Sequence, residues 1–332
     1  MAEFLSQKRH NTRANWTRIL EKDVKPGWGN KQFRDITPDD ALALFNAKAK
    51  RWPKQADEVR KVLRRLCSWA VSERIITADA DPTKDVAKRV PKRQNRERFL
   101  NDEELKIFWL ACGRLGWPFG SAFKLLALTA QRREEIGAAG WREFKGETWT
   151  VPGARTKNGK ANIVHLSKQA VAVLATVPKT GDLLFASRGT APSGYSKAKN
   201  RLDSYMNEIA GAPVEAWVLH DLRRTTTTGM ARLGIAPHVA DRVLNHTAGT
   251  ISGVAKVYNQ FDYLEEREMA LDGWALFVEL ICERNMPSSV AVAQVKRWLR
   301  EEPGRRERVA RGEDALAAPE GADNVFPIRT AS

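Results

Sequence analysis

Cysteine is scarce in this chain, and long apolar runs are missing. Cys67, Cys112 and Cys282 form no CxxC pair in the 332 residues, so they predict neither a disulfide framework nor a thiolate metal site. No stretch of about 18 apolar residues predicts a membrane span, and the first ten residues contain no apolar signal-peptide core. These absences favour a protein of the reducing cytoplasm, near the bacterial nucleoid, with no membrane partner.

The sequence also lacks the motifs of nucleotide and metal chemistry. It contains no P-loop and no carboxylate cluster with clear metal-ligand spacing. We therefore expect no cofactor, no metal and no use of ATP. A metal-dependent nuclease, which would need such carboxylates, is disfavoured for the same reason.

Positive charge is abundant and unevenly distributed. The chain has 55 Lys and Arg against 40 Asp and Glu, a net charge of +15. Residues 1–98 hold 24 Lys and Arg against 13 Asp and Glu, a net charge of +11. Such an excess favours a polyanionic partner such as nucleic acid, although a merely soluble basic surface is the alternative.

The pattern of helices predicts a helical first domain over residues 1–85. Thr37 and Asp40 form a helix-start signature, and a second helix is expected from about Gln55 to Ile76. Its apolar face leaves four basic residues largely on the other side. These are Arg60, Lys61, Arg64 and Arg65. They are candidate DNA contacts, and a solvated helix face explains them equally well.

A basic linker is expected over residues 86–99, followed by a second domain over residues 100–284. Asn101 and Glu104 form a capping signature. Extended segments at about 149–152 and 161–166 flank Asn158-Gly159, a strong hairpin signal. Helices are expected elsewhere, including one from about Tyr263 to Cys282. The fold class is therefore mainly α with a small antiparallel β-sheet, and residues 285–332 are expected to be a partly disordered tail with one helix at about 290–300.

Four local features carry chemistry. Arg132 follows Thr129-Ala130-Gln131 where a new helix is expected, so backbone N–H groups and a guanidinium could serve one anion. Lys157 precedes the hairpin turn, where a single ammonium can enter a DNA groove, and Lys160 across the turn competes for that role. In isolation, a surface arginine and a turn lysine are the simpler interpretations.

The third and fourth features are His220-Asp221-Leu222-Arg223-Arg224 and Leu244-Asn245-His246, the latter followed by Tyr258. His220 and Arg223 are three residues apart, so a helix places them on one face. Tyr258 is flanked by polar residues. Tyr195 and Tyr205 lie on an apolar stripe, which indicates core, and Tyr263 remains a rival to Tyr258.

The order TAQRREEI, RTKNGK, HDLRRT, LNH and VYNQ resembles the catalytic domain of the tyrosine recombinases, the phage integrase family, over about residues 101–280. Residues 1–85 resemble its helical core-binding domain. The resemblance implies two catalytic arginines, a hairpin lysine, two histidines and a tyrosine nucleophile, with a supporting acid. On this chain they match Arg132, Arg223, Lys157, His220, His246, Tyr258 and Glu135.

Two departures from the family pattern stand out. Ala130 occupies a position where many members have Gly, which is tolerated unless the backbone there needs a positive φ. No additional N-terminal arm-binding domain is visible in the sequence. A missing domain and a shorter recombinase that needs no arm sites are both open interpretations.

The resemblance implies site-specific integration or excision of a phage or mobile element through a 3′-phosphotyrosyl intermediate. Expected partners are double-stranded DNA at attachment sites, a homotetramer assembled on it, and DNA-bending accessory proteins. The helix at 263–282 could dock on a neighbouring subunit or form intrachain core. A non-catalytic DNA-binding protein of the same fold and a type IB topoisomerase-like enzyme are the alternatives.

Overall fold

The computed structural model describes residues 2–6, 10–88, 97–186, 189–246 and 262–310. The chain divides into two compact units, Met1–Arg96 and Glu97–Ser332. The division falls within the segment expected to be a linker, while the domain limits themselves stay a prediction. Among the described residues, no helix is long and apolar enough to cross a membrane.

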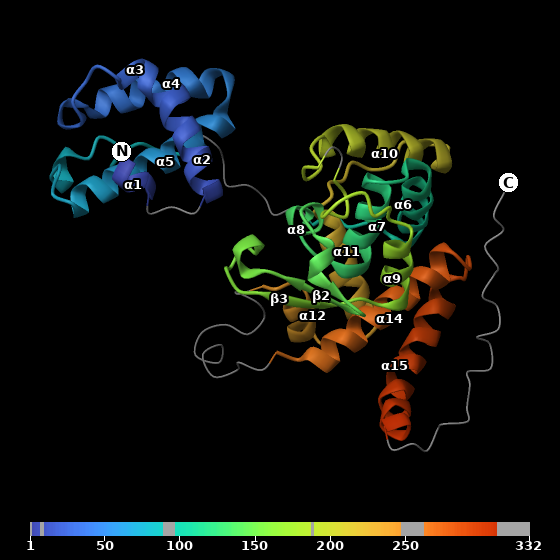
Figure 1. Ribbon diagram of the computed structural model, residues 1–332. Helices are drawn as coiled ribbons and strands as arrows, with labels where there is room; N and C mark the ends of the chain where they lie inside the picture. Colours follow the sequence, from blue (N-terminus) through green and yellow to red (C-terminus); the bar gives the residue numbers. More distant parts are fainter. Residues whose placement is uncertain (1, 7–9, 89–96, 187–188, 247–261, 311–332) are drawn as a thin grey trace. The chain divides into compact units, whose positions relative to one another are not determined.

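The regular elements of the first unit, where it is described, are all helices joined by turns and loops (Figure 1). Thr37 caps α4 as its sequence predicts, because its hydroxyl accepts from the Asp40 N–H at 3.2 Å and the Asp40 carboxylate accepts from the Thr37 N–H at 3.0 Å. The helical elements are α1 (Ala2–Ser6), α2 (His10–Ile19), η1 (Leu20–Val24), α3 (Lys25–Trp28), η2 (Phe33–Asp35), α4 (Pro38–Arg51), α5 (Pro53–Ser72) and η3 (Ala78–Ala80).

Helix α5 supplies the largest share of this unit's core. Its residues Val59, Val62 and Leu63 are at most 1% exposed and pack with Phe45 of α4. The helix ends four residues before the predicted limit at Ile76, and Arg74 beyond it takes a left-handed φ of 57°. The predicted apolar face is therefore confirmed, and only the end of the helix was misplaced.

The second unit combines helices with a three-stranded antiparallel sheet in the order β1-β2-β3. Trp149 of β2 pairs with Val164 of β3, as the hairpin signal predicted. The two-residue strand β1 was not predicted. The strands are β1 (Phe144–Lys145), β2 (Thr148–Val151) and β3 (Asn162–His165). The helices are α6 (Asp102–Leu115), α7 (Phe119–Thr129), α8 (Arg133–Gly137), η4 (Trp141–Glu143), η5 (Gly153–Arg155), α9 (Lys168–Ala175), α10 (Tyr195–Ala210), α11 (Asp221–Arg232), α12 (Pro237–Val243), α14 (Leu264–Cys282) and α15 (Ser288–Ala310).

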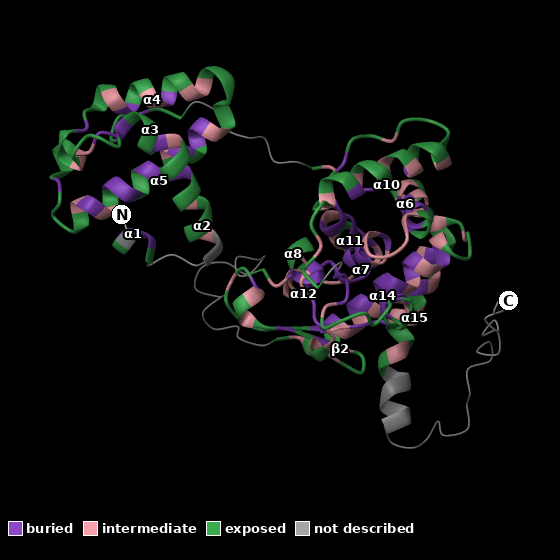
Figure 2. Ribbon diagram, turned by 45° about the horizontal axis from the view of Figure 1, so that its top comes forward, coloured by how far each residue is buried: buried purple, intermediate pink, exposed green. Residues whose placement is uncertain are grey.

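Helix α14 is the centre of the second unit. It contacts α6, α7, α9, α11, α12, α15 and β3, and it is largely buried in Figure 2. Trp274, Phe277 and Val278 are at most 1% exposed, and the Trp274 indole donates to the Ala127 carbonyl at 2.8 Å. Most apolar residues of this helix are thus intrachain core, which answers the question left open by the sequence, although Leu264 at its start is exposed.

Residues 288–310 form a longer helix than the composition of this segment suggested. Helix α15 extends to Ala310, beyond the expected limit near residue 300. Ala291 and Val295 are fully buried, and Leu299 lies close to Gly273 of α14. Although the sequence is rich in Arg and Glu, these few apolar residues at helical spacing form a face that docks the helix on α14.

The contact between α11 and α14 depends on a glycine. A Cβ placed on Gly229 would lie 2.0 Å from Cζ3 of Trp274, whose ring is held by surrounding core. Gly229→Ala is expected to lower the free energy of unfolding by about 1–3 kcal/mol through overpacking. Denaturant unfolding checks this. The control is Gly113→Ala on the exposed side of α6, where no atom lies within 4 Å of the added Cβ. It should be neutral or stabilising, and equal losses in both variants would contradict the packing argument.

Candidate functional site

Arg223 lies in the first turn of α11 and is only 5% exposed. Its Nη1 donates to the Ala130 carbonyl, and its Nη2 donates to the Leu244 carbonyl at 2.9 Å. Burial, followed by the positive charge of Arg132, lowers the pKa of Arg223 to about 10. It stays charged at neutral pH, and these two bonds occupy only part of the five N–H donors of a guanidinium.

Arg132 begins α8 and presents a second guanidinium to the same site. The buried Glu135 carboxylate accepts from the Arg132 backbone N–H and from its Nη1, both at 3.0 Å. The Glu135 side chain is 2% exposed and that of Arg132 is 21% exposed. Glu135 therefore holds Arg132 from the protein side and leaves part of the guanidinium accessible, while its supporting role in the reaction stays a prediction.

The turn before Arg132 is strained. Ala130 is fully buried and has a left-handed φ of 54°, the condition under which the absence of Gly matters. A left-handed conformation costs a non-glycine residue about 1–2 kcal/mol. The same turn aims the Ala130 carbonyl at Arg223, so the strained residue supplies one of the acceptors of the buried arginine.

His220 and His246 join the two arginines. His220 precedes α11, and His246 Nε2 lies 3.4 Å from Nη2 of Arg223. His246 Nδ1 lies 3.3 Å from the Asp241 carboxylate. A proton on Nδ1 satisfies both His246 contacts, because Nδ1 then donates to Asp241 and Nε2 accepts from Arg223. Desolvation comes first in lowering the pKa of each histidine, and the positive charge of Arg223 acts in the same direction.

Gln131 connects the segments that carry these residues, and sequence reasoning missed it. Its side chain is fully buried, donates to the Val243 carbonyl at 2.9 Å and accepts from Asn162 Nδ2 at 3.0 Å. Asn162 in turn accepts from Arg267 Nη2 at 3.1 Å. The turn of Arg132, the end of α12 and strand β3 are therefore linked through one amide. A polar residue between an apolar helix and the candidate arginine Arg132 was the only available signal.

The loop that carries Lys157 is tied to the same region. Lys157 and Lys160 are both exposed, while the neighbouring Asn158 donates to Asn245 Oδ1 at 2.6 Å. Asn245 directly precedes His246. The structure thus joins the lysine loop to the second histidine, and the choice between Lys157 and Lys160 as the functional lysine stays a prediction.

The predicted nucleophile, Tyr258, lies outside the described residues. The other three tyrosines lie within the described residues, and each makes contacts there. Burial raises the pKa of Tyr195 to about 12, Tyr205 accepts from Arg201 Nε at 2.9 Å, and the Tyr263 ring lies 4.9 Å from that of His238. The predicted core role of Tyr195 fits its contacts with Phe119 and Phe123.

The four basic residues of α5 differ from one another. Arg60 has a side chain only 13% exposed and lies 3.6 Å from the buried Asp57, so it contributes to the packing of the first unit. Lys61 is exposed and pairs with Glu58 at 2.6 Å. Arg64 and Arg65 are exposed. A DNA contact remains a prediction for all four, and it is weakest for Arg60.

Comparison with known protein families identifies the family of this chain. Residues 98–264 match the phage integrase family, and residues 1–89 match the phage integrase central domain. The chain belongs to the phage integrase family, the tyrosine recombinases. The expected fold class, a helical domain followed by a mainly helical catalytic domain with a small sheet, is confirmed.

Two curated relatives are prophage integrases of Escherichia coli strain K12. The chain is 28% identical to Prophage integrase IntZ over 80% of its own length and 66% of the relative. It is 28% identical to Prophage integrase IntA over 79% of its length and 64% of that relative. The chain therefore spans about two thirds of the length of these integrases.

Solved integrases share the fold at low identity. A lambda integrase tetramer bound to a Holliday junction matches with a TM-score of 0.57 and 17% identity, covering 76% of this chain and 79% of that one. The Tn1549 transposon integrase in complex with a circular intermediate DNA matches with a TM-score of 0.54 and 14% identity, covering 79% and 98%. These likenesses establish the fold of this phage integrase family member.

The Gln131 link gives a stability prediction. Gln131→Leu leaves the Asn162 amide and the Val243 carbonyl without this partner in the core, and such buried groups cost about 1–3 kcal/mol when unsatisfied. Denaturant unfolding should show a loss of this size. Gln294→Leu, at a half-buried position on α15, is the control and should change stability by less than about 0.5 kcal/mol. Equal stability of Gln131→Leu and wild type would show that the link is dispensable.

The two site histidines give a pH prediction. Both have a pKa below the ordinary value of 6.5, so the unfolded chain takes up protons first as the pH falls. Acidification through 6.5 therefore lowers the free energy of unfolding, and the loss levels off only below the folded pKa values. NMR titration of the ring signals should give midpoints below 6.5. His246→Gln should lose less stability than wild type between pH 7 and pH 5. A midpoint above 6.5 would contradict burial and the charge of Arg223 as the causes of the lowered pKa values.

Proposed function

We propose that this chain is a site-specific DNA recombinase that cleaves and rejoins DNA through a 3′-phosphotyrosyl intermediate on Tyr258. The observation that carries the proposal is the convergence of two arginines at one place: Arg132, held by the buried Glu135, and Arg223, which His246 contacts. Two guanidiniums held by the protein at one place form a receptor for a single phosphate group.

The arginines suit the charge that builds during phosphoryl transfer. Attack on a phosphodiester produces a five-coordinate phosphorus with extra negative charge on its non-bridging oxygens. Arg132 and Arg223 would hold those oxygens with N–H donors that are already oriented, so little reorganisation is needed in the transition state. Glu135 and the Ala130 and Leu244 carbonyls keep both groups in place.

Proton transfer is assigned to the remaining groups. A tyrosine phenol has a pKa near 10, so attack by Tyr258 requires a base, and His220 suits because its lowered pKa keeps it neutral. Lys157 would protonate the leaving 5′-oxygen from its exposed loop. His246 would add a hydrogen bond to the phosphate from Nε2, which must then carry a proton in place of the contact that it accepts from Arg223. The bond energy is conserved in the covalent link, so neither ATP nor a metal is needed for the step.

The assignment of Tyr258 is supported by the other tyrosines. The chain has four, and Tyr195, Tyr205 and Tyr263 are each engaged in packing, hydrogen bonding or ring contact. Tyr263 also opens α14 with a left-handed φ of 52°, which fits a structural position. Tyr258 is the remaining candidate.

Double-stranded DNA at attachment sites is the proposed substrate. The net charge of +15 fits it, and phosphate contacts should make binding strongly salt-dependent. Strand exchange by a tetramer on DNA is proposed by analogy with the lambda integrase tetramer bound to a Holliday junction. Integration or excision of a mobile element, DNA-bending accessory proteins and a cytoplasmic location stay predictions.

A nicked suicide substrate tests the chemistry. DNA carrying the chain's own attachment site, taken from the flanks of its gene, is incubated with the protein in the presence of a chelator and run on a denaturing gel. The wild type should form a covalent protein–DNA band because the cleaved strand end diffuses away before religation. Tyr258→Phe should abolish the band, because the proposed nucleophilic oxygen is then missing.

Tyr263→Phe is the matched control and should retain the band. A band that persists in Tyr258→Phe but disappears in Tyr263→Phe would transfer the nucleophile to Tyr263. Tight DNA binding by the wild type without any band would favour the non-catalytic DNA-binding alternative. Relaxation of supercoiled DNA without recombination of two sites would favour the topoisomerase-like one.

A further inference from the structure

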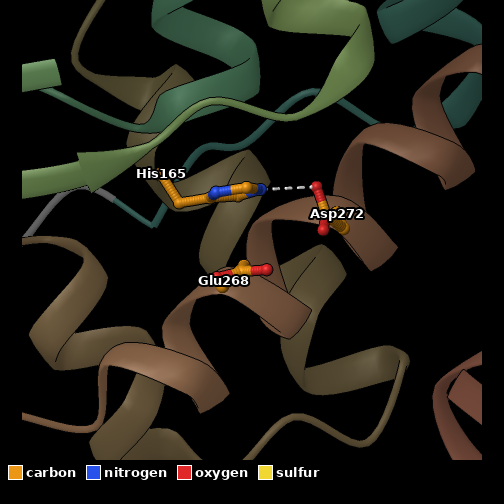
Figure 3. A group of neighbouring side chains, drawn as sticks. All are labelled: His165, Glu268 and Asp272. Carbon is orange, nitrogen blue, oxygen red and sulfur yellow. Dashed lines mark hydrogen bonds and ion pairs between the residues drawn. The ribbon is translucent and has the colours of Figure 1, made fainter. Parts of the chain in front are cut away.

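A second cluster of polar side chains lies between the sheet and the central helix. His165 ends β3, and Glu268 and Asp272 lie one turn apart on α14. Figure 3 shows the imidazole reaching from the strand towards Asp272, with Glu268 on the same face of the helix. His165 Nε2 lies 2.8 Å from Asp272 Oδ1. The arginine site uses other helices, α8 and α11, so this cluster is separate from the proposed chemistry.

The three side chains form a mixed nitrogen and oxygen donor set. An imidazole with two carboxylates suits first-row transition ions such as Zn²⁺, whereas Mg²⁺ and Ca²⁺ prefer oxygen alone. The i,i+4 spacing of Glu268 and Asp272 places both carboxylates on one helix face, and the same spacing positions two ligands in helical zinc motifs. Glu147 adds negative charge near His165.

The distances fit an ion after a small adjustment. One donor atom from each of the three residues lies within 4.8 Å of the others. Zinc binds nitrogen and oxygen at about 2.0–2.2 Å, so two ligands of a tetrahedral ion lie about 3.3–3.6 Å apart. The donor atoms that are farthest apart must therefore approach by up to about 1.4 Å, and the His165–Asp272 pair must open slightly from 2.8 Å. The side chains of His165 and Asp272 are 15% and 19% exposed, so an ion can enter without unfolding the unit.

We propose that His165, Glu268 and Asp272 bind a divalent transition-metal ion of the Zn²⁺ type, with water completing its coordination. The ion replaces the direct hydrogen bond between His165 and Asp272, and each of these side chains instead forms a bond to the metal. It has no part in the proposed DNA chemistry. Its effect is structural, because it clips strand β3 to helix α14.

The proposed ion would join two elements that adjoin, along the chain, the segments of Lys157 and Tyr258. β3 leads away from the loop that carries Lys157, and α14 follows the segment that contains Tyr258. Binding of an ion would stabilise the docking of these two elements. It is expected to raise the thermal stability of the unit by mass action.

Zinc titration of the full chain tests the site. Protein stripped with a chelator and dialysed is titrated with ZnCl₂ by calorimetry, and its Tm is followed in parallel. Saturable binding is expected, with Tm raised by roughly 5–10 °C at zinc concentrations about 100 times the Kd. Mg²⁺ at the same concentration should leave Tm unchanged. Visible absorption of bound Co²⁺ provides a readout that does not depend on stability.

Two variants decide whether this cluster is the site. His165→Gln should abolish the binding, and Glu268→Gln should weaken it by at least about tenfold. Glu268→Gln keeps the His165–Asp272 contact, so it stays decisive even if His165→Gln fails to fold. The control is His238→Gln, a half-buried histidine on α12, which should bind zinc as wild type does. Absence of saturable binding in the wild type, or equal affinity in all variants, would overturn the proposal. Neither result depends on whether the chain recombines DNA.

Discussion

A guanidinium removed from water must find its hydrogen-bond acceptors within the protein, and this constraint organises the second unit. Arg223 finds them on the carbonyls of Ala130 and Leu244, which belong to two separate turns. Breaking either contact would leave a buried charge partly unsatisfied. Removal of one partner of a buried ion typically costs several kcal/mol. The positions of Arg132 and His246 therefore follow from the burial of Arg223.

Further hydrogen bonds between polar groups extend this arrangement across the second unit. Gln131 joins the Arg132 turn to α12 and to β3, and Asn158 joins the lysine loop to Asn245. Underneath, α14 supplies an apolar surface for most of the surrounding helices. A rigid core with polar cross-links at its edge suits a site that must meet a phosphate with its donors already aligned. The strained Ala130 is kept in place by the same network.

Much of this could be predicted from local patterns. The capping boxes at Thr37 and Asn101, the hairpin strands and the apolar face of α5 all follow from interactions within a few residues, which sequence spacing records directly. The order of the arginine, histidine and tyrosine motifs predicted the family. The length of α15 was misjudged because charged residues obscured the few apolar ones that dock it, Ala291 and Val295.

The sequence by itself determined the residue types, their order and the helical and extended segments that carry them, because these depend on short-range periodicity and capping. Tertiary structure alone decided three other matters: the assignment of α14 to intrachain core, the roles of Gln131 and Asn162 as cross-links, and the meeting of His165 with Asp272 across more than 100 residues. The physical reason is that a buried polar group is satisfied by whatever lies nearest in space. That neighbour is set by how the helices pack and leaves no signal in the local sequence.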